Sequence, residues 1–578
     1  MGAWLAEAPR AAYVALMHPF SYHPVDPGAV YEQWGSDTRV RTGRSLPKDA
    51  QTATELYADV FDSAMSRAER DALLASATQT WSWRDVQAGL LSVGERKVRL
   101  ASQEVTTEVH GDLATVRIHD VWRNQGFDRE EILLAFDLPD SAAITGLWMG
   151  PDPDVAEAFA YIVAPRGAAQ EVYESEVQRR VDPALLESVG PRQYRLRAFP
   201  VEPRDSSYDS LYHFGDEGPD LHVWMELVVP VVDGVVATPV LDEARNAFWD
   251  GSEARTVDGW TVASDTWVSP VAAAASTPRQ PHEAVVSGFR VTAEPARATP
   301  KPLGRVDVVI DGSASMRFHR EDLAAALRAL DGEEARIWCV REGSLQVCDD
   351  FDPATAVFWG HASVAEQIAY QPWTRDALVV LTDPGSYELV GDLNDRLTRD
   401  DLPPLWLVHL GGFPSAYPDW TLDRITQSGG GIAASVDELR ERMADPTLVD
   451  GWRFTVEPAG EAPSTASSPF DAIAARAAIR SLAREQQGAD LRHLDALHAL
   501  AVENHVVSPW SSMIVLVDQA QKDRLKEASE ADDRFEREGI DQEGFTDVSA
   551  TPEPGTWLLL VLGGGLLAGT ARRQQDGA

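Results

Sequence analysis

The hydrophobic pattern of this chain changes once along its length, and this change limits the folds open to it. Between residues 98 and 232, apolar and polar residues alternate, as around Val105, with the period of two that is typical of β-strands with one buried face. After residue 304, mostly apolar runs at 305–310 and 377–381 are typical of strands buried on both faces of a parallel sheet. The pattern therefore predicts an all-β region followed by an α/β region.

Charge and composition exclude several classes of protein. The chain has 578 residues, with 91 Asp and Glu against 51 Lys and Arg, a formal net charge of −40. Such acidity argues against a nucleic-acid-coating protein or a protein adsorbed to anionic lipid, since both need a basic surface. It favours divalent cations or basic partners, and a saline habitat is another explanation. The hydrophobic fraction of 44% excludes global disorder.

The pattern and the turn signals divide the chain into six segments. We expect an N-terminal helical and mixed region (1–95), a β domain (96–235), a linker with strands (236–303), an α/β domain (304–447), a C-terminal strand and helix region (448–545) and a tail with a short hydrophobic helix (546–578).

The two cysteines flank a predicted hairpin. A two-residue Gly343-Ser344 turn would place Cys339 and Cys348 directly opposite each other, in a non-hydrogen-bonded pair where a disulfide is feasible. A disulfide would suit an oxidising compartment, whereas the alternative is two reduced cysteines in a small sheet. Two cysteines also exclude a disulfide framework and a Cys-rich zinc site.

The all-β region carries short motifs in a characteristic order. They are Asn124 at a strand end, Phe-Asp-Leu-Pro at 136–139, Tyr-Glu at 173–174, Asp-Pro-Ala-Leu-Leu-Glu at 182–187 and Tyr-Arg-Leu-Arg-Ala-Phe-Pro at 194–200. This order resembles the VIT domain of vault and inter-alpha-trypsin inhibitor proteins, over about residues 98–232. The resemblance implies a β-sandwich-like interaction module with no known catalytic residues.

Oxygen-bearing side chains follow two of the predicted buried strands. Asp311, Ser313 and Ser315 follow the strand at 305–310, and Asp383 follows the strand at 377–381. Because ligands of doubly wound sheets bind at the carboxyl ends of the strands, we expect these groups to lie together. Carboxylate and hydroxyl oxygens suit a hard cation, Mg²⁺ or alternatively Mn²⁺ or Ca²⁺.

This Asp-x-Ser-x-Ser turn resembles the metal-ion-dependent adhesion site (MIDAS) of the von Willebrand factor type A domain. The resemblance implies a doubly wound fold and an open metal coordination position for an acidic group of a partner. Two departures stand out: Pro384 precedes Gly385 where the family has Asp-Gly, and Ser363 stands where the family supplies a Thr. The alternative is that Asp311 and Ser313 merely cap the following helix.

The C-terminal tail has the form of a sorting signal. Pro552, Glu553 and Pro554 precede a largely apolar stretch of about 15 residues, roughly 22 Å as a helix, which is short for a bilayer core of ~30 Å. Arg572 and Arg573 follow it. The tail resembles the PEP-CTERM signal of Gram-negative bacteria, which exosortase enzymes process, and a plain tail anchor is the alternative.

The N-terminus and the region before the tail complete this interpretation. Residues 1–20 lack a signal-peptide pattern, and an upstream membrane segment encoded separately would reconcile this with an envelope tail. Residues 505–515 resemble the segment that follows the A domain in inter-alpha-trypsin inhibitor heavy chains. The resemblance to these heavy chains, in order of parts, therefore covers about 98–520.

Other chemistry finds little support in the sequence. There is no His-Glu-x-x-His, Gly-x-x-x-x-Gly-Lys-Ser/Thr, Cys-x-x-Cys or Gly-x-Ser-x-Gly motif. His409 at a strand end is interpreted as a structural histidine and His319 as a solvent-exposed one. A hydrolase would need a spatial triad that nothing in the sequence indicates.

Taken together, we expect a β-sandwich-like VIT domain, a doubly wound A-like domain, helical flanks and a C-terminal hydrophobic helix. The expected function is non-enzymatic: a bacterial cell-envelope protein, its soluble part periplasmic or extracellular, that binds a protein or an acidic polysaccharide through a divalent cation. The alternative is a metal-free structural or assembly component of the exosortase and exopolysaccharide system.

Overall fold

The computed structural model describes residues 96–537, with gaps at 128, 180, 205–217, 274–276, 300, 342–343, 349, 359–363, 365–367, 370, 385–386, 388, 390–401, 415, 461–467 and 486–489. These residues belong to the first of two compact units, Met1–Arg537. The second unit, Glu538–Ala578, lies outside the described residues, and so does the predicted tail helix. No helix in the described part of the chain combines the length and apolar character needed to cross a membrane.

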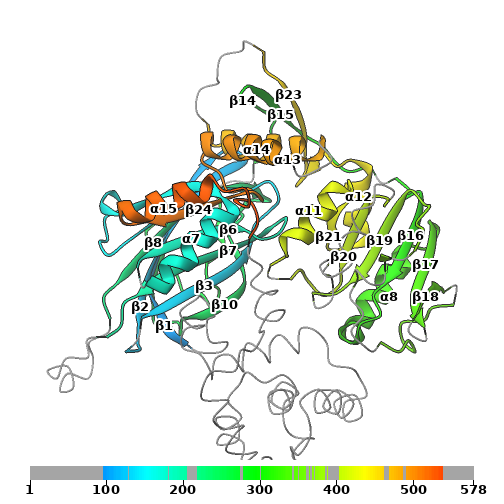
Figure 1. The fold of residues 1–578 in the computed structure, drawn as a ribbon, viewed down its shortest axis with the longest axis horizontal. Coiled ribbons are helices and arrows are strands. Elements are labelled where there is room, and N and C mark those ends of the chain that lie inside the picture. The colour runs from blue at the N-terminus through cyan, green and yellow to red at the C-terminus, as the bar shows by residue number, and fades with distance from the viewer. Residues whose placement is uncertain are drawn as a thin grey trace, which may run out of the picture. The chain divides into compact units, whose positions relative to one another are not determined.

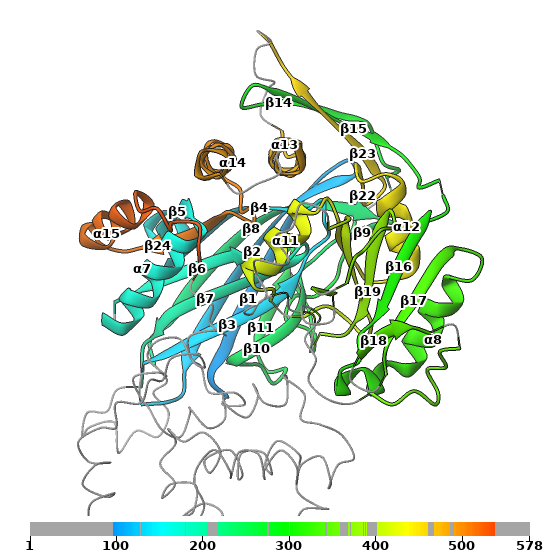
Figure 2. The same ribbon diagram turned by 45° about the vertical axis from the view of Figure 1, so that its right-hand side comes forward.

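The largest element of the fold is a sheet of ten strands whose pairing closes on itself. In order around the ring they are β1 (Arg96–His110), β10 (Val240–Phe248), β3 (Glu130–Asp137), β7 (Gln193–Val201), β6 (Pro183–Ser188), β24 (Ser511–Leu516), β5 (Phe159–Pro165), β4 (Ala143–Gly150), β8 (Leu221–Val232) and β2 (Leu113–Asn124), which pairs with β1 again. All neighbours are antiparallel except β1 and β10. Figure 2 shows this sheet curling round its own interior.

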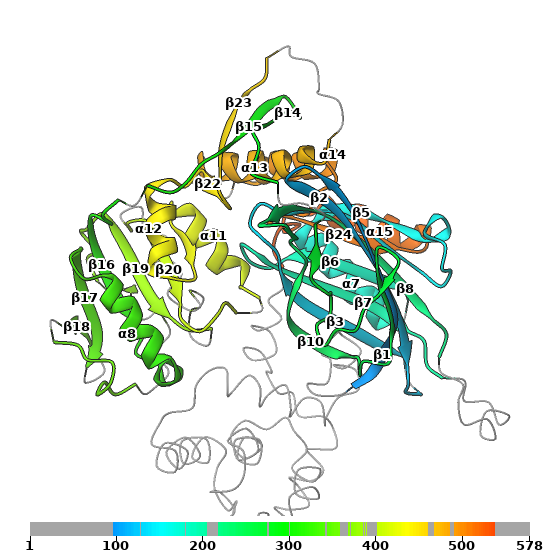
Figure 3. The same ribbon diagram turned by 180° about the vertical axis from the view of Figure 1, so that it is seen from behind.

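The closed sheet forms because its strands alternate around an apolar interior. Its main core cluster includes Trp122 and Trp267, both almost completely buried, with inward residues from every strand of the ring. A tight turn joins the first two strands, where His110 pairs with Leu113 and Gly111 adopts a positive φ of 71°. Glycine adopts such a φ at less cost than residues with a side chain. Figure 3 shows β1 and β2 from the other side.

The closed sheet contradicts the predicted β-sandwich. A sandwich has two separate sheets, whereas here each of the ten strands has a hydrogen-bonded neighbour on both sides. Two strands that complete the ring come from outside the expected domain: β24 lies between β5 and β6, and β10 lies between β1 and β3. Alternation along a strand predicts which face of the strand is buried, but it does not indicate which strands pair with each other.

Short strands and two helices extend the closed sheet. The short elements are β9 (Val235–Val236), β11 (Ala254–Val257), β12 (Trp260–Thr261), β13 (Val271–Ala272) and the 3-10 helix η2 (Val155–Glu157). Helices α7 (Arg166–Arg179) and α15 (Gln519–Ser529) lie side by side on its outer surface, far apart in sequence (Figure 1). Part of the segment predicted as linker therefore forms strands of the main sheet and its margin.

A second, smaller sheet lies against two helices. Its strands, in order, are β14 (His282–Val286), β15 (Phe289–Pro295), β23 (Trp452–Pro458) and β22 (Leu448–Val449). Helices α13 (Phe470–Glu485) and α14 (Leu491–Glu503) share a core cluster with it (Figure 1). The strands of this sheet lie before and after the α/β region, so the α/β region is an insertion between them.

The α/β region forms a six-stranded sheet. The strand order is β18 (Ser344–Val347), β17 (Glu334–Arg341), β16 (Arg305–Ile310), β19 (Ala377–Thr382), β20 (Leu405–His409) and β21 (Gly431–Ala433), parallel except for the edge strand β18. The described helices are η4 (Ala314–His319), α8 (Arg320–Ala329), α11 (Asp419–Gln427) and α12 (Val436–Ala444). Apolar clusters cover both faces of the sheet.

The predicted fold class is wrong, because the domains are not arranged as we expected. We expected a doubly wound A-like domain beside a separate sandwich, whereas most strands of the described chain belong to the closed sheet and its extensions. The α/β segment is inserted in the smaller sheet, and the segment that follows it returns to complete the closed one. Seven α-helices are present in the described residues, and none is the predicted hydrophobic tail helix.

A buried ion network ties the end of the described chain to the closed sheet and to helix α11. Arg537 donates hydrogen bonds to Asp419 of α11 (2.6 Å) and to Glu187 of β6 (3.1 Å). Nearby, Arg166 at the start of α7 pairs with Asp423 of α11 at 2.8 Å. Burial alone would raise the pKa of Glu187, but the guanidiniums of Arg195 and Arg537, among others, hold it at about 2. These contacts fix α11 against the closed sheet.

Candidate cation site

Two buried carboxylates follow neighbouring strands of the six-stranded sheet. Asp311 follows β16 and Asp383 follows β19, and Ile310 pairs with Leu381 in the parallel register. The N–H of Asp311 donates to the carbonyl of Leu381 at 3.0 Å, which continues the sheet by one residue. Asp311 and Asp383 are 0% and 1% exposed. The structure thus brings together the two strand ends from which the sequence predicted cation ligands.

Local hydrogen bonds fix the carboxylate of Asp311. Its Oδ1 accepts from the backbone N–H of Ser313 (2.9 Å), and its Oδ2 accepts from the hydroxyl of Thr382 (2.8 Å). Thr382 is the last residue of β19 and is completely buried. Sequence reasoning missed Thr382, although its place one residue before Asp383 was a usable signal. The carboxylate of Asp311 and the hydroxyl of Thr382 therefore meet at this edge, and the buried Asp383 follows Thr382 directly.

The predicted serine ligands are placed only in part. The side chain of Ser313 is fully buried and stands immediately before η4, where it forms no capping hydrogen bond. This disfavours the alternative in which Ser313 is simply a helix cap. Ser315 lies within η4, but its side chain falls outside the described part of the structure, as does the whole of Ser363. The structure therefore says nothing of these two as ligands.

The two histidines near this edge have different surroundings. His409 pairs with Thr382 across the sheet and is 1% exposed, with the rings of Tyr387 and Tyr417 5.5 Å away. Burial lowers the pKa of His409 to about 3, so its imidazole is neutral at physiological pH. His319 is half-buried, and its Nδ1 lies 3.6 Å from Asp322. His409 is thus a buried structural residue, and His319 is less exposed than predicted.

The chemistry of this edge is that of oxygen donors. In the described residues, no three His, Cys, Asp or Glu side chains gather closely enough to hold a metal by themselves. A cation at Asp311 and Asp383 would therefore take two carboxylates, with hydroxyls and retained waters completing its shell. That donor set fits Mg²⁺, which binds few protein carboxylates and keeps several waters. It would not fit a zinc site, which prefers nitrogen and sulfur donors.

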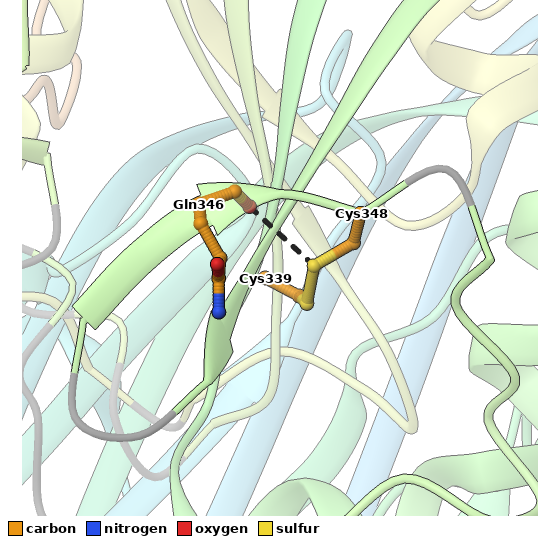
Figure 4. The surroundings of a disulfide bond; sticks show 3 residues. All are labelled: Cys339, Gln346 and Cys348. Carbon is orange, nitrogen blue, oxygen red and sulfur yellow. Dashed lines mark hydrogen bonds between the residues drawn. A yellow bond between two sulfur atoms is a disulfide. The ribbon is translucent and has the colours of Figure 1, made fainter.

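The two cysteines form a disulfide at the edge of the same sheet. Cys339 of β17 and Cys348, just after β18, are bonded with Cα atoms 5.9 Å apart (Figure 4). The predicted pairing register was wrong: Cys339 pairs with Gln346, and Cys348 donates its N–H to Ile337. The turn therefore precedes Ser344, and the disulfide joins diagonal neighbours, which lie on one face of the sheet.

Comparison with known proteins assigns one part of the chain. Residues 100–208 match the family described as the Vault protein inter-alpha-trypsin domain, so the chain contains a VIT domain there. No curated protein matches the chain. The match ends before β8, β10 and β24, so three strands of the closed sheet lie outside it. The match also ends before the candidate cation site, so it gives no information about the function of that site or of the tail.

Proposed function

We propose that this chain is a non-enzymatic binding protein whose six-stranded sheet holds a divalent cation at Asp311 and Asp383. The observation that carries the proposal is the placement of these two buried carboxylates at adjacent strand ends, beside the hydroxyls of Ser313 and Thr382. Burying ionised carboxylates is costly unless positive charge compensates them. A bound cation would supply that charge.

An incomplete protein shell would give this site its function. Asp311 and Asp383 would hold the cation with the neighbouring hydroxyls, leaving coordination positions for water or for an acidic group of a partner. The resemblance of the Asp-x-Ser-x-Ser turn to an adhesion site supports this use of the cation. The partner would be a surface protein or an acidic polysaccharide, because both present carboxylates.

The VIT domain supports a binding role over a catalytic one. Its core is filled by apolar side chains, as around Trp122, and it would act as a rigid support for the cation site through the ion network at Arg537 and Asp419. Interaction modules need such rigidity to hold a site in a fixed geometry.

We also propose that the protein works in the bacterial cell envelope. The resemblance of residues 552–573 to a PEP-CTERM signal supports processing by an exosortase-type enzyme and membrane contact through the apolar stretch. The Cys339–Cys348 disulfide supports an oxidising location. The oxidation state of these cysteines in protein from its native host tests this location, because reduced thiols there would contradict it.

The test of the cation site is a thermal melt of the whole chain with Mg²⁺, Mn²⁺ or EDTA. A cation at ~100 times its Kd stabilises the folded state by ~2.7 kcal/mol, so Tm should rise in the wild type. Asp311→Asn should abolish the rise, because it removes one of the two anionic ligands. Asp437→Ala is the matched control, since this carboxylate on α12 is 82% exposed and removed from the site.

The outcomes separate the two functional hypotheses. A rise in the wild type and in Asp437→Ala, absent in Asp311→Asn, supports the cation site. If no cation raises the Tm of the wild type, the site binds none, and the metal-free structural role replaces the proposal.

A further inference from the structure

A large cavity lies away from the candidate cation site. Its volume is about 720 Å³, within the range of ~300–1,000 Å³ that small-molecule sites occupy. Helices α11, α12 and α13 line it, together with the segment before the smaller sheet's β22 and residues Asp140 and Arg192 of the closed sheet. All of these belong to the compact unit that ends at Arg537.

The cavity lining reverses the charge balance of the protein. The whole chain has far more acidic than basic residues, 91 against 51. The cavity is lined by six arginines against five carboxylates: Arg192, Arg297, Arg442, Arg476, Arg480 and Arg484, with Asp140, Asp423, Glu438, Glu441 and Asp450. A basic lining inside so acidic a protein is expected to attract anions into this cavity.

Three of the arginines form a stripe on α13. Arg476, Arg480 and Arg484 follow each other at intervals of four residues, so they share one face of the helix. Their guanidiniums donate to the carbonyls of Ala142, Asp140 (3.0 Å for Arg480) and Pro446 respectively. In the described residues, none of the three forms an ion pair within 4.0 Å, and the carboxylate of Asp140, which also pairs with Arg192 and Arg442, offsets their positive charge only in part.

Two carboxylates of the lining are engaged outside the cavity, and a third pairs with two lining arginines that do not belong to α13. Asp423 pairs with Arg166 at 2.8 Å, and Asp450 accepts the N–H of Ser141 at 2.8 Å. Glu438 binds both Arg192 and Arg442. Positive charge therefore remains on the α13 side.

The titration of Arg480 and Asp140 agrees with this imbalance. Burial, together with the neighbouring guanidiniums of Arg476 and Arg484, lowers the pKa of Arg480 to about 10. Burial would raise the pKa of Asp140, but Arg442 and the other surrounding arginines hold it well below its usual range. An added anion would relieve the repulsion between the guanidiniums.

The remaining walls of the cavity are apolar. Trp406, Ile432, Ile479 and Trp510 face it together with the aliphatic side chains of α11. The cavity thus combines a cationic side with an apolar side. We propose that it binds a small organic anion that carries at least two carboxylate or phosphate groups on an apolar body. The guanidiniums of Arg480 and Arg484 would bind the anionic groups in paired hydrogen bonds, and the tryptophans would contact the body.

Calorimetric titration of the whole chain, dialysed into a metal-free buffer that contains no polycarboxylate, tests this proposal. The probes are benzene-1,3,5-tricarboxylate, which has both charge and an apolar ring, and inorganic pyrophosphate, which has charge alone. We expect saturable 1:1 binding of the tricarboxylate, weakened at least about tenfold in the double variant Arg480→Gln/Arg484→Gln, because two charge-assisted contacts are lost. Arg492→Gln on α14, whose side chain is 90% exposed, is the matched control and should bind like the wild type.

Two further comparisons keep the proposal open to refutation. If the double variant fails to fold by circular dichroism, the single variant Arg484→Gln, at the exposed end of the stripe, should still weaken binding about fivefold. Asp311→Asn should leave binding unchanged, which separates this cavity from the cation site. Stronger binding of pyrophosphate than of the tricarboxylate would contradict the proposed role of the apolar wall. Absence of saturable binding by both probes, or equal binding by the arginine variants, would overturn the proposal.

Discussion

The closed sheet and the six-stranded sheet bury similar apolar cores but are assembled from the chain in different ways. All strands of the six-stranded sheet lie between Arg305 and Ala433, so this sheet is built from one continuous segment. The ten strands of the closed sheet run from Arg96 to Leu516, with the whole α/β region between β10 and β24. The comparison teaches that the six-stranded sheet is formed by residues near one another in sequence. The closed sheet, in contrast, needs β24, which lies far along the chain from its other strands.

Charge is also managed differently in the two sheets. The closed sheet buries Glu187 against Arg195 and Arg537, so its buried charge is paired by side chains. The six-stranded sheet pairs Asp307 with Arg336 and Arg375 in the same way, whereas Asp311 at a strand end accepts hydrogen bonds from a backbone N–H and a hydroxyl. Paired charge holds the closed sheet together, and the strand-end acids form the candidate site.

The largest expected effect on stability comes from a charged substitution in β24 of the closed sheet. Ile514 of β24 is completely buried in an apolar cluster with α7 and α15. Ile514→Asp should lower the free energy of unfolding by about 5 kcal/mol or more, because it buries a charge without a partner. Urea unfolding followed by tryptophan fluorescence measures this loss. Val502→Asp on α14, 42% exposed, is the control and should cost less than about 1 kcal/mol. Similar midpoints for the two variants would show that β24 is dispensable.

The next largest effect on stability comes from disrupting the ion network between the closed sheet and α11. Arg537→Ala removes one of the buried cations paired with Glu187 and Asp419, which keep Arg195 and Arg166 respectively, and should cost about 3 kcal/mol. Arg492→Ala should cost less than about 1 kcal/mol, since its ion pair is exposed. Urea unfolding at pH 7 compares the two variants.

The pH dependence of this network has a definite sign. The pKa of Glu187 is lowered from 4.5 to about 2 by folding, so its contribution is present above pH 4.5 and is lost as the pH falls toward 2. Without Arg537, the pKa of Glu187 in the folded protein should be less depressed, so the loss of stability in acid should be smaller and should be complete at a higher pH. An unchanged acid limb in Arg537→Ala would contradict the role of this network.

The smallest effect concerns the edge of the six-stranded sheet. The disulfide closes a short loop, with Cys339 and Cys348 nine residues apart, so Cys339→Ser/Cys348→Ser should cost about 2–3 kcal/mol. We expect the added hydrogen exchange to be confined to β17 and β18, with no change in β24. Exchange that rises equally in the closed sheet would show that the two sheets unfold as one unit.

Local elements could be predicted from the sequence. The strand at 305–310 matches β16 residue for residue, and the expected strand at 377–381 is β19 with one residue added. Both are apolar runs that end at polar residues, so neighbouring residues alone define them. In each case the signal lies within the element.

What could not be predicted depends on partners distant in sequence. The Asp-Pro-Ala-Leu-Leu motif includes the first four residues of β6, whose neighbour β24 comes more than 300 residues later. Likewise, Thr382 becomes part of the candidate site only because the register of β16 and β19 places it beside Asp311. The hairpin register at Cys339 failed by two residues because a Gly-Ser pair does not determine where a turn begins.

The place of β24 has a consequence for how the protein is made. A ribosome releases β5 and β6 long before Ser511–Leu516, so these two strands wait with open edges while about 320 further residues are added. Open strand edges pair readily with other chains, which makes the nascent protein prone to aggregation in this interval. The α/β region, complete by residue 444, can fold meanwhile. The strand that closes the ten-stranded sheet is therefore made late, and a chain cut short before residue 511 never completes that sheet.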